Sequence, residues 1–142
     1  MIKQMLVAYD FSDAARRALE WAAGLQRSVG GAMVVLHVVD PTPSGAALSP
    51  MPLPILTEGE QQRIEGALRD AAASAGAKAT IDLRINPSAG AATIECARQL
   101  NADLIVVGTR GQGGVKRALL GSTADHLVRH ADCPVVTIRD AT

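Results

Sequence analysis

Short apolar runs alternate along the chain with longer segments in which apolar residues recur every three or four positions. Five runs have the length and the β-branched character of strands, at residues 5–9, 33–39, 79–85, 103–108 and 135–139. The first, second and fourth are almost continuously apolar, which is typical of strands in a parallel sheet covered on both faces. The third alternates between apolar and polar residues, which predicts a strand near an edge of the sheet.

The segments between these runs carry the end signals of helices. Ser12 is a candidate N-cap of a first helix, and Thr57 with Glu60 forms a capping box before a second helix that Gly76 ends. Signals of the same kinds predict two further helices, between Ser88 and Asn101 and between Gly121 and Cys133.

Alternating strands and helices predict one domain, residues 1–142, of the α/β class. The expected architecture is a doubly wound, five-stranded parallel sheet with helices on both faces. The apolar spacing places Val29 and Val128 on the buried faces of the first and last helices. Small aliphatic side chains must form the core, because aromatic residues make up only 2% of the chain.

The charge balance narrows the classes of function. Lys and Arg total 14, as do Asp and Glu, so the chain lacks the cationic excess that binds a nucleic acid backbone. No stretch approaches the ~20 apolar residues that span a bilayer, so we expect no membrane insertion. Cys96 and Cys133 show neither metal-ligand spacing nor a disulfide framework, and we expect two small buried thiols in a reducing cytoplasm.

Some features are assigned to structure rather than to chemistry. His126 and His130 stand four apart on the last predicted helix, a spacing that can hold a metal ion, but the sequence offers no third ligand and we interpret them as surface histidines. His37 lies inside an apolar run and is interpreted as a satisfied core histidine. The proline-rich segment 41–54 is interpreted as a surface loop, with a lid or a partner-docking segment as the alternative.

A glycine-rich stretch at residues 108–123 follows the fourth predicted strand and precedes the last helix. Open α/β sheets bind ligands beyond the carboxyl ends of their strands, at the point where the connections change direction. Amide groups at residues 111–114 could form an anion-binding nest, and those of Ser122 and Thr123 would add the positive end of a helix. The stretch fits neither a Walker P-loop nor the dinucleotide fingerprint, since Lys116 stands where the latter requires glycine. The glycines alone leave a purely structural turn as an alternative.

The spacing Gly108-x2-Gly111-x9-Gly121-Ser122 resembles the signature G-x2-G-x9-G-(S/T) of the universal stress protein family. Residues 10–12, 36–40, 101–108 and 128–136 also look like that family, so the resemblance covers the whole chain. It implies a Rossmann-like sheet of order 3-2-1-4-5 and a homodimer joined through the last strand, residues 135–139. It also implies that ATP is bound, because the subfamily that keeps the signature binds this nucleotide.

The resemblance assigns site residues one by one. On the adenine and ribose side it implies Ala8, Asp10 and Val38, where Val38 would offer backbone groups to the base. Asp10 could also contact a phosphate-bound Mg²⁺, with support of the Ser12 cap as its alternative role. Thr109, Arg110 and Gln112 depart from the common family pattern, although Gln112 is counted with the binding residues. The phosphate and ribose side comprises Gly108, Gly111, Gly113, Gly114, Gly121, Ser122 and Thr123.

The resulting hypothesis is an ATP-binding cytoplasmic protein that regulates or senses stress through its nucleotide state, without catalytic residues. A slow ATP hydrolase is the first alternative, and Asp10 is the only nearby acid that the motif offers it. A ligand-independent dimeric scaffold and a variant that binds a cyclic nucleotide are the others. The nucleotide that co-purifies with the protein would separate these hypotheses. ATP would support the sensor, ADP the hydrolase, and an empty protein the scaffold.

Overall fold

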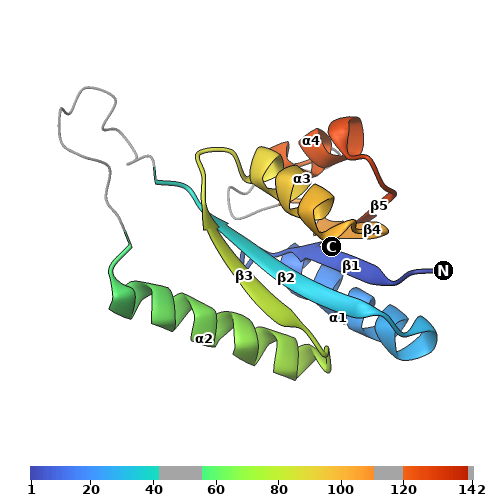
Figure 1. The fold of residues 1–142 in the computed structure, drawn as a ribbon, viewed down its shortest axis with the longest axis horizontal. Helices are drawn as coiled ribbons and strands as arrows, with labels where there is room; N and C mark the ends of the chain where they lie inside the picture. The colour runs from blue at the N-terminus through green and yellow to red at the C-terminus, as the bar shows by residue number, and fades with distance from the viewer. Residues whose placement is uncertain (42–55, 111–119, 141–142) are drawn as a thin grey trace.

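The computed structural model describes residues 1–41, 56–110 and 120–140. Strands and helices alternate through these ranges (Figure 1), and the sheet has the order β3-β2-β1-β4-β5 with every neighbouring pair parallel. The predicted α/β architecture and strand order are confirmed. The elements are β1 Gln4–Ala8, α1 Asp13–Val29, β2 Ala32–Val39, α2 Glu58–Ala75, β3 Thr80–Ile85, α3 Ala89–Leu100, β4 Leu104–Gly108, α4 Ser122–His130 and β5 Val135–Ile138.

Two helical layers cover the sheet, with α1 and α2 on one face and α3 and α4 on the other (Figure 1). Strand β1 contributes to both cores, because successive side chains point to opposite faces. Met5 and Val7 belong to the cluster that holds buried residues of α1 and α2. Leu6 belongs to the cluster formed with α3 and α4. This double coverage is the physical reason for the continuous apolar runs in the central strands.

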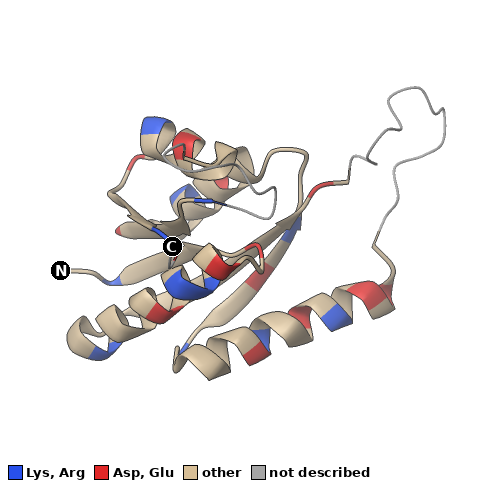
Figure 2. Ribbon diagram, turned by 180° about the vertical axis from the view of Figure 1, so that it is seen from behind, with Lys and Arg blue, Asp and Glu red and all other residues tan. Residues whose placement is uncertain are grey.

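The two outer strands are less buried. Every residue of β5 is partly exposed, and so is every residue of β3, whose alternating sequence predicted an edge position. Acidic and basic residues are interspersed along α1 and α2 on the face seen in Figure 2. In the part of the chain that the structure describes, no helix is long and apolar enough to cross a membrane.

Helix ends follow the predicted chemistry. The Ser12 side chain accepts a hydrogen bond from the amide of Ala15, and Thr57 and Glu60 form both bonds of the capping box. Gly76 and Asn101 end their helices in the left-handed conformation, at φ of 73° and 52° respectively.

The expected burial of two valines is wrong. Val29 is 46% exposed and Val128 is 52% exposed. Val29 is the last residue of α1, where the helix is already ending. Helix α4 has only nine residues and buries Ala124 and Leu127, so the position after Leu127, rotated by about 100° around the axis, faces outward.

Candidate functional site

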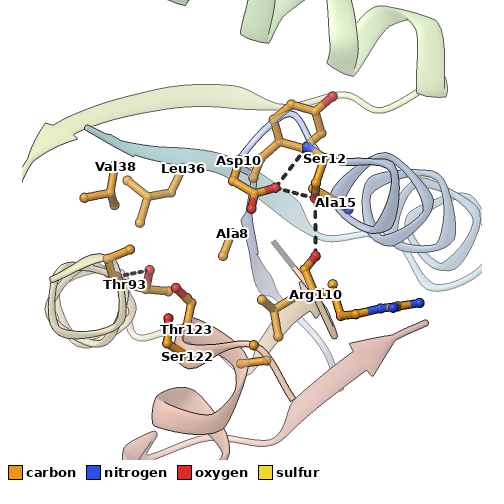
Figure 3. A pocket seen from close by; sticks show the side chains of 16 residues that line it. Ala8, Asp10, Ser12, Ala15, Leu36, Val38, Thr93, Arg110, Ser122 and Thr123 are labelled. Carbon is orange, nitrogen blue, oxygen red and sulfur yellow. Dashed lines mark hydrogen bonds between the residues drawn. The ribbon is translucent and has the colours of Figure 1, made fainter. Parts of the chain in front are cut away.

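A pocket opens at the carboxyl ends of the central strands (Figure 3). The empty space in it is about 560 Å³, which includes open solvent. Residues of β1, β2 and β4 and the N-terminal parts of α1, α3 and α4 line it. Strands β1 and β4 are neighbours in the sheet. After β1 the chain continues into α1 on one face, whereas after β4 it continues into α4 on the other face. The pocket therefore lies at the topological switch point, where open α/β sheets bind ligands.

The sequence-predicted residues within the described ranges all line this one pocket. They come from four different elements and their flanking turns, and they are Ala8, Asp10, Val38, Gly108, Gly121, Ser122 and Thr123. The remaining predicted residues, Gly111, Gln112, Gly113 and Gly114, lie outside the described residues, as do residues 42–54 of the proline-rich segment.

The turn from β1 into α1 gives Asp10 a structural role. One oxygen of its carboxylate accepts hydrogen bonds from the amide of Ser12, at 3.0 Å, and from the Ser12 hydroxyl. The same hydroxyl oxygen accepts a bond of 3.1 Å from the amide of Ala15 and so caps α1. Asp10 thus supports the Ser12 cap, which is one of the two roles that the sequence allowed for it; the other is a contact to the ligand. Asp10 also lies on the pocket wall (Figure 3).

Phe11 lies between these two residues in a left-handed conformation, at φ 64°. Its ring meets those of Tyr9 and His37 edge-on, with ring centroids 5.0 Å apart in each pair. Nδ1 of His37 lies 2.8 Å from the carbonyl oxygen of Tyr9, so His37 is satisfied within the fold, as expected. Burial raises the pKa of the Tyr9 hydroxyl.

Gly108 ends β4 and has a packing reason to be glycine. A Cβ atom there would stand 2.8 Å from the carbonyl carbon and from the Cβ of Ala14. No side chain fits in that space, because α1 packs against the end of β4. Close packing of a helix, in addition to any approach of a ligand, therefore explains this part of the glycine signature.

The start of α4 differs from the starts of the other helices. Ser12, Thr57 and Ser88 cap their helices through side chains, whereas among the described residues no side chain caps α4. Its N-cap is Gly121, whose amide donates to the carbonyl of Thr109 at 2.6 Å. The first residues of α4 thus present the positive end of a helix to the pocket, a place that suits an anion.

Gly121 itself has ordinary backbone angles, φ −59° and ψ 161°, which residues with side chains also adopt. It is buried and lines the pocket. An unusual conformation therefore does not account for glycine at this position, whereas the lack of a side chain keeps the helix start open towards the pocket.

Two charged side chains belong to the described lining, Asp10 and Arg110. The guanidinium of Arg110 is turned away from the pocket interior (Figure 3), and its Nη2 lies 2.6 Å from Oδ1 of Asp140. Thr93 adds a buried hydroxyl that donates to the carbonyl oxygen of Ala89 at 2.7 Å.

Sequence reasoning missed part of the lining. Leu36 precedes Val38 by two residues and pairs with Ala8, so strand periodicity and register could have found it. Thr93 gave no signal, since a threonine inside a helix is unremarkable in sequence. The other missed residues are Tyr9, Ser12, Ala15, Ala89, Val107, Arg110 and Ala124.

No group of three or more His, Cys, Asp or Glu side chains is placed to hold a metal ion in residues 1–41, 56–110 and 120–140. The rings of His126 and His130 pack against each other with centroids 4.7 Å apart. Cys96 is buried, and burial raises the pKa of its thiol to about 11, so this thiol stays protonated at neutral pH. Cys133 is partly exposed, which departs from the burial expected for both thiols.

Comparisons of the sequence and of the fold with known proteins indicate the same family. The profile of the Universal stress protein family matches residues 1–139. The chain belongs to this family. A universal stress protein in the QAH/OAS sulfhydrylase 3'region of Thermus aquaticus is 34% identical over 142 residues, which cover 98% of this chain and 100% of the relative.

Solved structures of universal stress proteins have the same fold. The universal stress protein UspA from Lactobacillus plantarum matches with a TM-score of 0.79 and 29% identity, over 97% of this chain and 98% of that one. A universal stress protein in complex with cAMP matches with a TM-score of 0.69 and 23% identity over 97% of each chain. One from Archaeoglobus fulgidus in complex with dAMP gives 0.68 and 24%, over 97% of this chain and 99% of that one.

Proposed function

We propose that this universal stress protein binds ATP in the switch-point pocket and acts as a nucleotide-dependent regulator or sensor of stress. The observation that carries the proposal is the convergence of Ala8, Asp10, Val38, Gly108 and Ser122, from separate elements, on one pocket beside an uncapped helix start. Solved structures with the same fold are in complex with cAMP and with dAMP, both adenine nucleotides, which supports the ligand class.

The lining suggests how the nucleotide lies. Leu36 and Val38 form an apolar wall at the end of β2, which suits the adenine ring. Ser122 and Thr123 lie at the start of α4, with Gly108 at the end of β4 in the same pocket lining, and the backbone amides and dipole of the helix start suit phosphates. The signature residues 111–114 would complete the phosphate contacts.

A divalent cation would enter with the phosphates. Mg²⁺ is bound in nucleotide sites by one or two carboxylates together with phosphate oxygens and water. Asp10 is the carboxylate of the described lining and fits that small donor set. When bound, Mg²⁺ would offset the repulsion between this carboxylate and the phosphate chain.

The pocket favours retention of ATP over its hydrolysis. Phosphoryl transfer to water requires a group that positions the attacking water at the terminal phosphate. The carboxylate available in the described lining, Asp10, already accepts two hydrogen bonds from Ser12. A slow hydrolase is therefore the weaker proposal. The relative in complex with cAMP makes a cyclic nucleotide the second candidate ligand.

An ATP titration by calorimetry on the Ser122→Glu variant tests the proposed site. Ser122 is exposed in the first turn of α4, where an acidic side chain favours the helix by about 0.3–1 kcal/mol, so the variant should fold. The new carboxylate would stand where the phosphates lie, and we expect ATP binding to be lost.

Gly59→Glu is the matched control. Gly59 lies in the first turn of α2, outside the pocket lining, and a Cβ there meets no atom within 4 Å. This variant should bind ATP as the wild type does. A folded Ser122→Glu protein with wild-type affinity would contradict the proposed phosphate position.

We also propose a homodimer joined through residues 135–139. Strand β5 ends the sheet, so one side of its backbone has no partner strand among the described residues. An apolar edge strand invites pairing, and a twofold-related copy would cover it with the same surface. This surface is also what a ligand-independent scaffold would use.

A further inference from the structure

Arg110 lines the pocket, and the role that we assign to it rests on the proposed nucleotide site. The carbonyl oxygen of Arg110 lies 3.4 Å from the hydroxyl of Ser12, next to the turn that carries Asp10. The backbone before Arg110 is anchored, because Thr109 forms backbone hydrogen bonds with Ile138 and Gly121. Its guanidinium leaves the pocket and pairs with Asp140. The two side chains are only 23% and 26% exposed, whereas the Arg98–Asp132 pair is 62% and 66% exposed. The Arg110 pair is therefore partly desolvated.

The two residues before Asp140 are held from two sides. The amide of Thr109 donates to the carbonyl oxygen of Ile138 at 2.8 Å, and Nε of Arg17 donates to that of Arg139 at 3.1 Å. Asp140 follows directly, on the side of Arg110 that faces away from the pocket. Because the chain is held up to Arg139, the carboxylate of Asp140 stands within reach of the guanidinium, and their contact keeps it directed away from the pocket.

A guanidinium binds phosphate oxygens with the same two-pronged geometry that it uses for carboxylates. The other charged residue of the described lining, Asp10, is negative. A rotation of the Arg110 side chain about its anchored backbone would exchange Asp140 for a phosphate. The exchange is favourable only for a ligand that brings enough negative charge to compete with the carboxylate.

We propose that Asp140 withholds Arg110 from the pocket, and that this competition determines which nucleotide is preferred, favouring a triphosphate over a cyclic monophosphate. With the base at Val38 and the first phosphate at the start of α4, the distal phosphates of ATP would have Arg110 as the cationic residue of the described lining. cAMP has one phosphate with a single charge and no distal group. Arg110 is thus a specificity-determining residue, and Asp140 is the positioning residue that tunes it.

Calorimetric titration of the full chain with ATP and, separately, with cAMP tests the proposal. Asp140→Asn keeps the shape of the side chain but removes its charge, so we expect the Kd of ATP to fall about threefold to tenfold. The Kd of cAMP should change by less than about twofold. Arg110→Gln should weaken ATP binding selectively, and Asp140→Asn should have no further effect in that background.

Asp132→Asn is the matched control, since it breaks the exposed Arg98–Asp132 pair and should change neither affinity. If Asp140→Asn changes the Kd of ATP and of cAMP equally, or changes neither, the proposed role of Arg110 is wrong. The proposed function would still stand in that case, provided that the wild type binds ATP. A wild-type protein that binds neither nucleotide would overturn both. Circular dichroism checks each fold, and the Asp140→Asn result decides the question even if Arg110→Gln does not fold.

Discussion

Individual residues of the pocket serve the fold as well as any ligand. Asp10 and Ser12 form the turn that starts α1, and Gly108 allows that helix to approach β4. Substitutions at these positions would change folding and binding together. Ser122 is a cleaner probe, because it is exposed and its helix start has no side-chain cap among the described residues.

Gly108→Ala should destabilise the protein by about 1–3 kcal/mol, since the new methyl group would overlap the backbone and the side chain of Ala14. Gly66→Ala is the control, because a Cβ there meets no atom within 4 Å and alanine suits a helix interior better by about 1 kcal/mol. Urea unfolding of the two variants should give shifts of opposite sign. A neutral Gly108→Ala would show that α1 can move away without cost.

Asp103 should make the stability of the fold depend on acid pH. Its carboxylate accepts hydrogen bonds from the amides of Lys3, at 2.8 Å, and Gln4, at 2.9 Å, and these bonds lower its pKa. The folded pKa lies below the unfolded value of about 3.9, so this stabilisation is present above that value and is lost as the pH falls through the folded pKa.

Asp103→Asn should therefore lower the urea midpoint at pH 7, and the difference from the wild type should shrink as the pH falls towards about 2.5. The measurement is a series of urea unfolding curves for both proteins at several pH values. A difference that stays constant across this range would show that the charge of Asp103 does not contribute.

At the scale of elements, local chemistry made the helix ends predictable. Ser12, Thr57 and Asn101 act on backbone groups only a few residues away, so their roles are visible in the sequence. The exposure of Val29 and Val128 was not predictable in this way. Periodicity indicates the face on which a residue lies, but the extent to which a helix covers the sheet depends on tertiary packing.

The pocket was predictable to the extent that strand ends define it. The family resemblance assigned Ala8, Val38 and Gly108, and they lie where the carboxyl ends of parallel strands share one edge. The pairing of Arg110 with Asp140 joins residues 30 positions apart and was not predicted. Contacts of this kind depend on the final meeting of two chain segments, and residue spacing carries no signal for them.

At the scale of the whole molecule, the proposed dimer gives a sharp test at β5. The carbonyl oxygens of Pro134 and Ile138 accept hydrogen bonds from Ile105 of β4 and from Thr109 directly after it, and alternation turns the amide of Thr137 to the outer edge. Thr137→Pro would remove an outward donor and leave the bonds to β4 intact. We expect light scattering to give a dimer mass for the wild type and a monomer mass for this variant.

Thr137→Ala keeps the amide and should stay dimeric. Trp21, the single tryptophan, provides a second readout because it is 42% exposed and stands one helical turn beyond Arg17, which contacts the segment after β5. Its fluorescence should shift to longer wavelength as the dimer dissociates. A monomeric wild type at micromolar concentration would contradict the proposed interface.

The central claim is that an adenine nucleotide occupies the pocket with its phosphates at the start of α4. A titration with ATP, followed by the backbone amide signals of ¹⁵N-labelled protein, tests it most directly. Among the described residues, we expect the largest chemical-shift changes at Gly108, Ser122 and Thr123. Changes centred instead on the second cavity, around Arg98, Asn101 and Cys133, or no changes at saturating ATP, would contradict it.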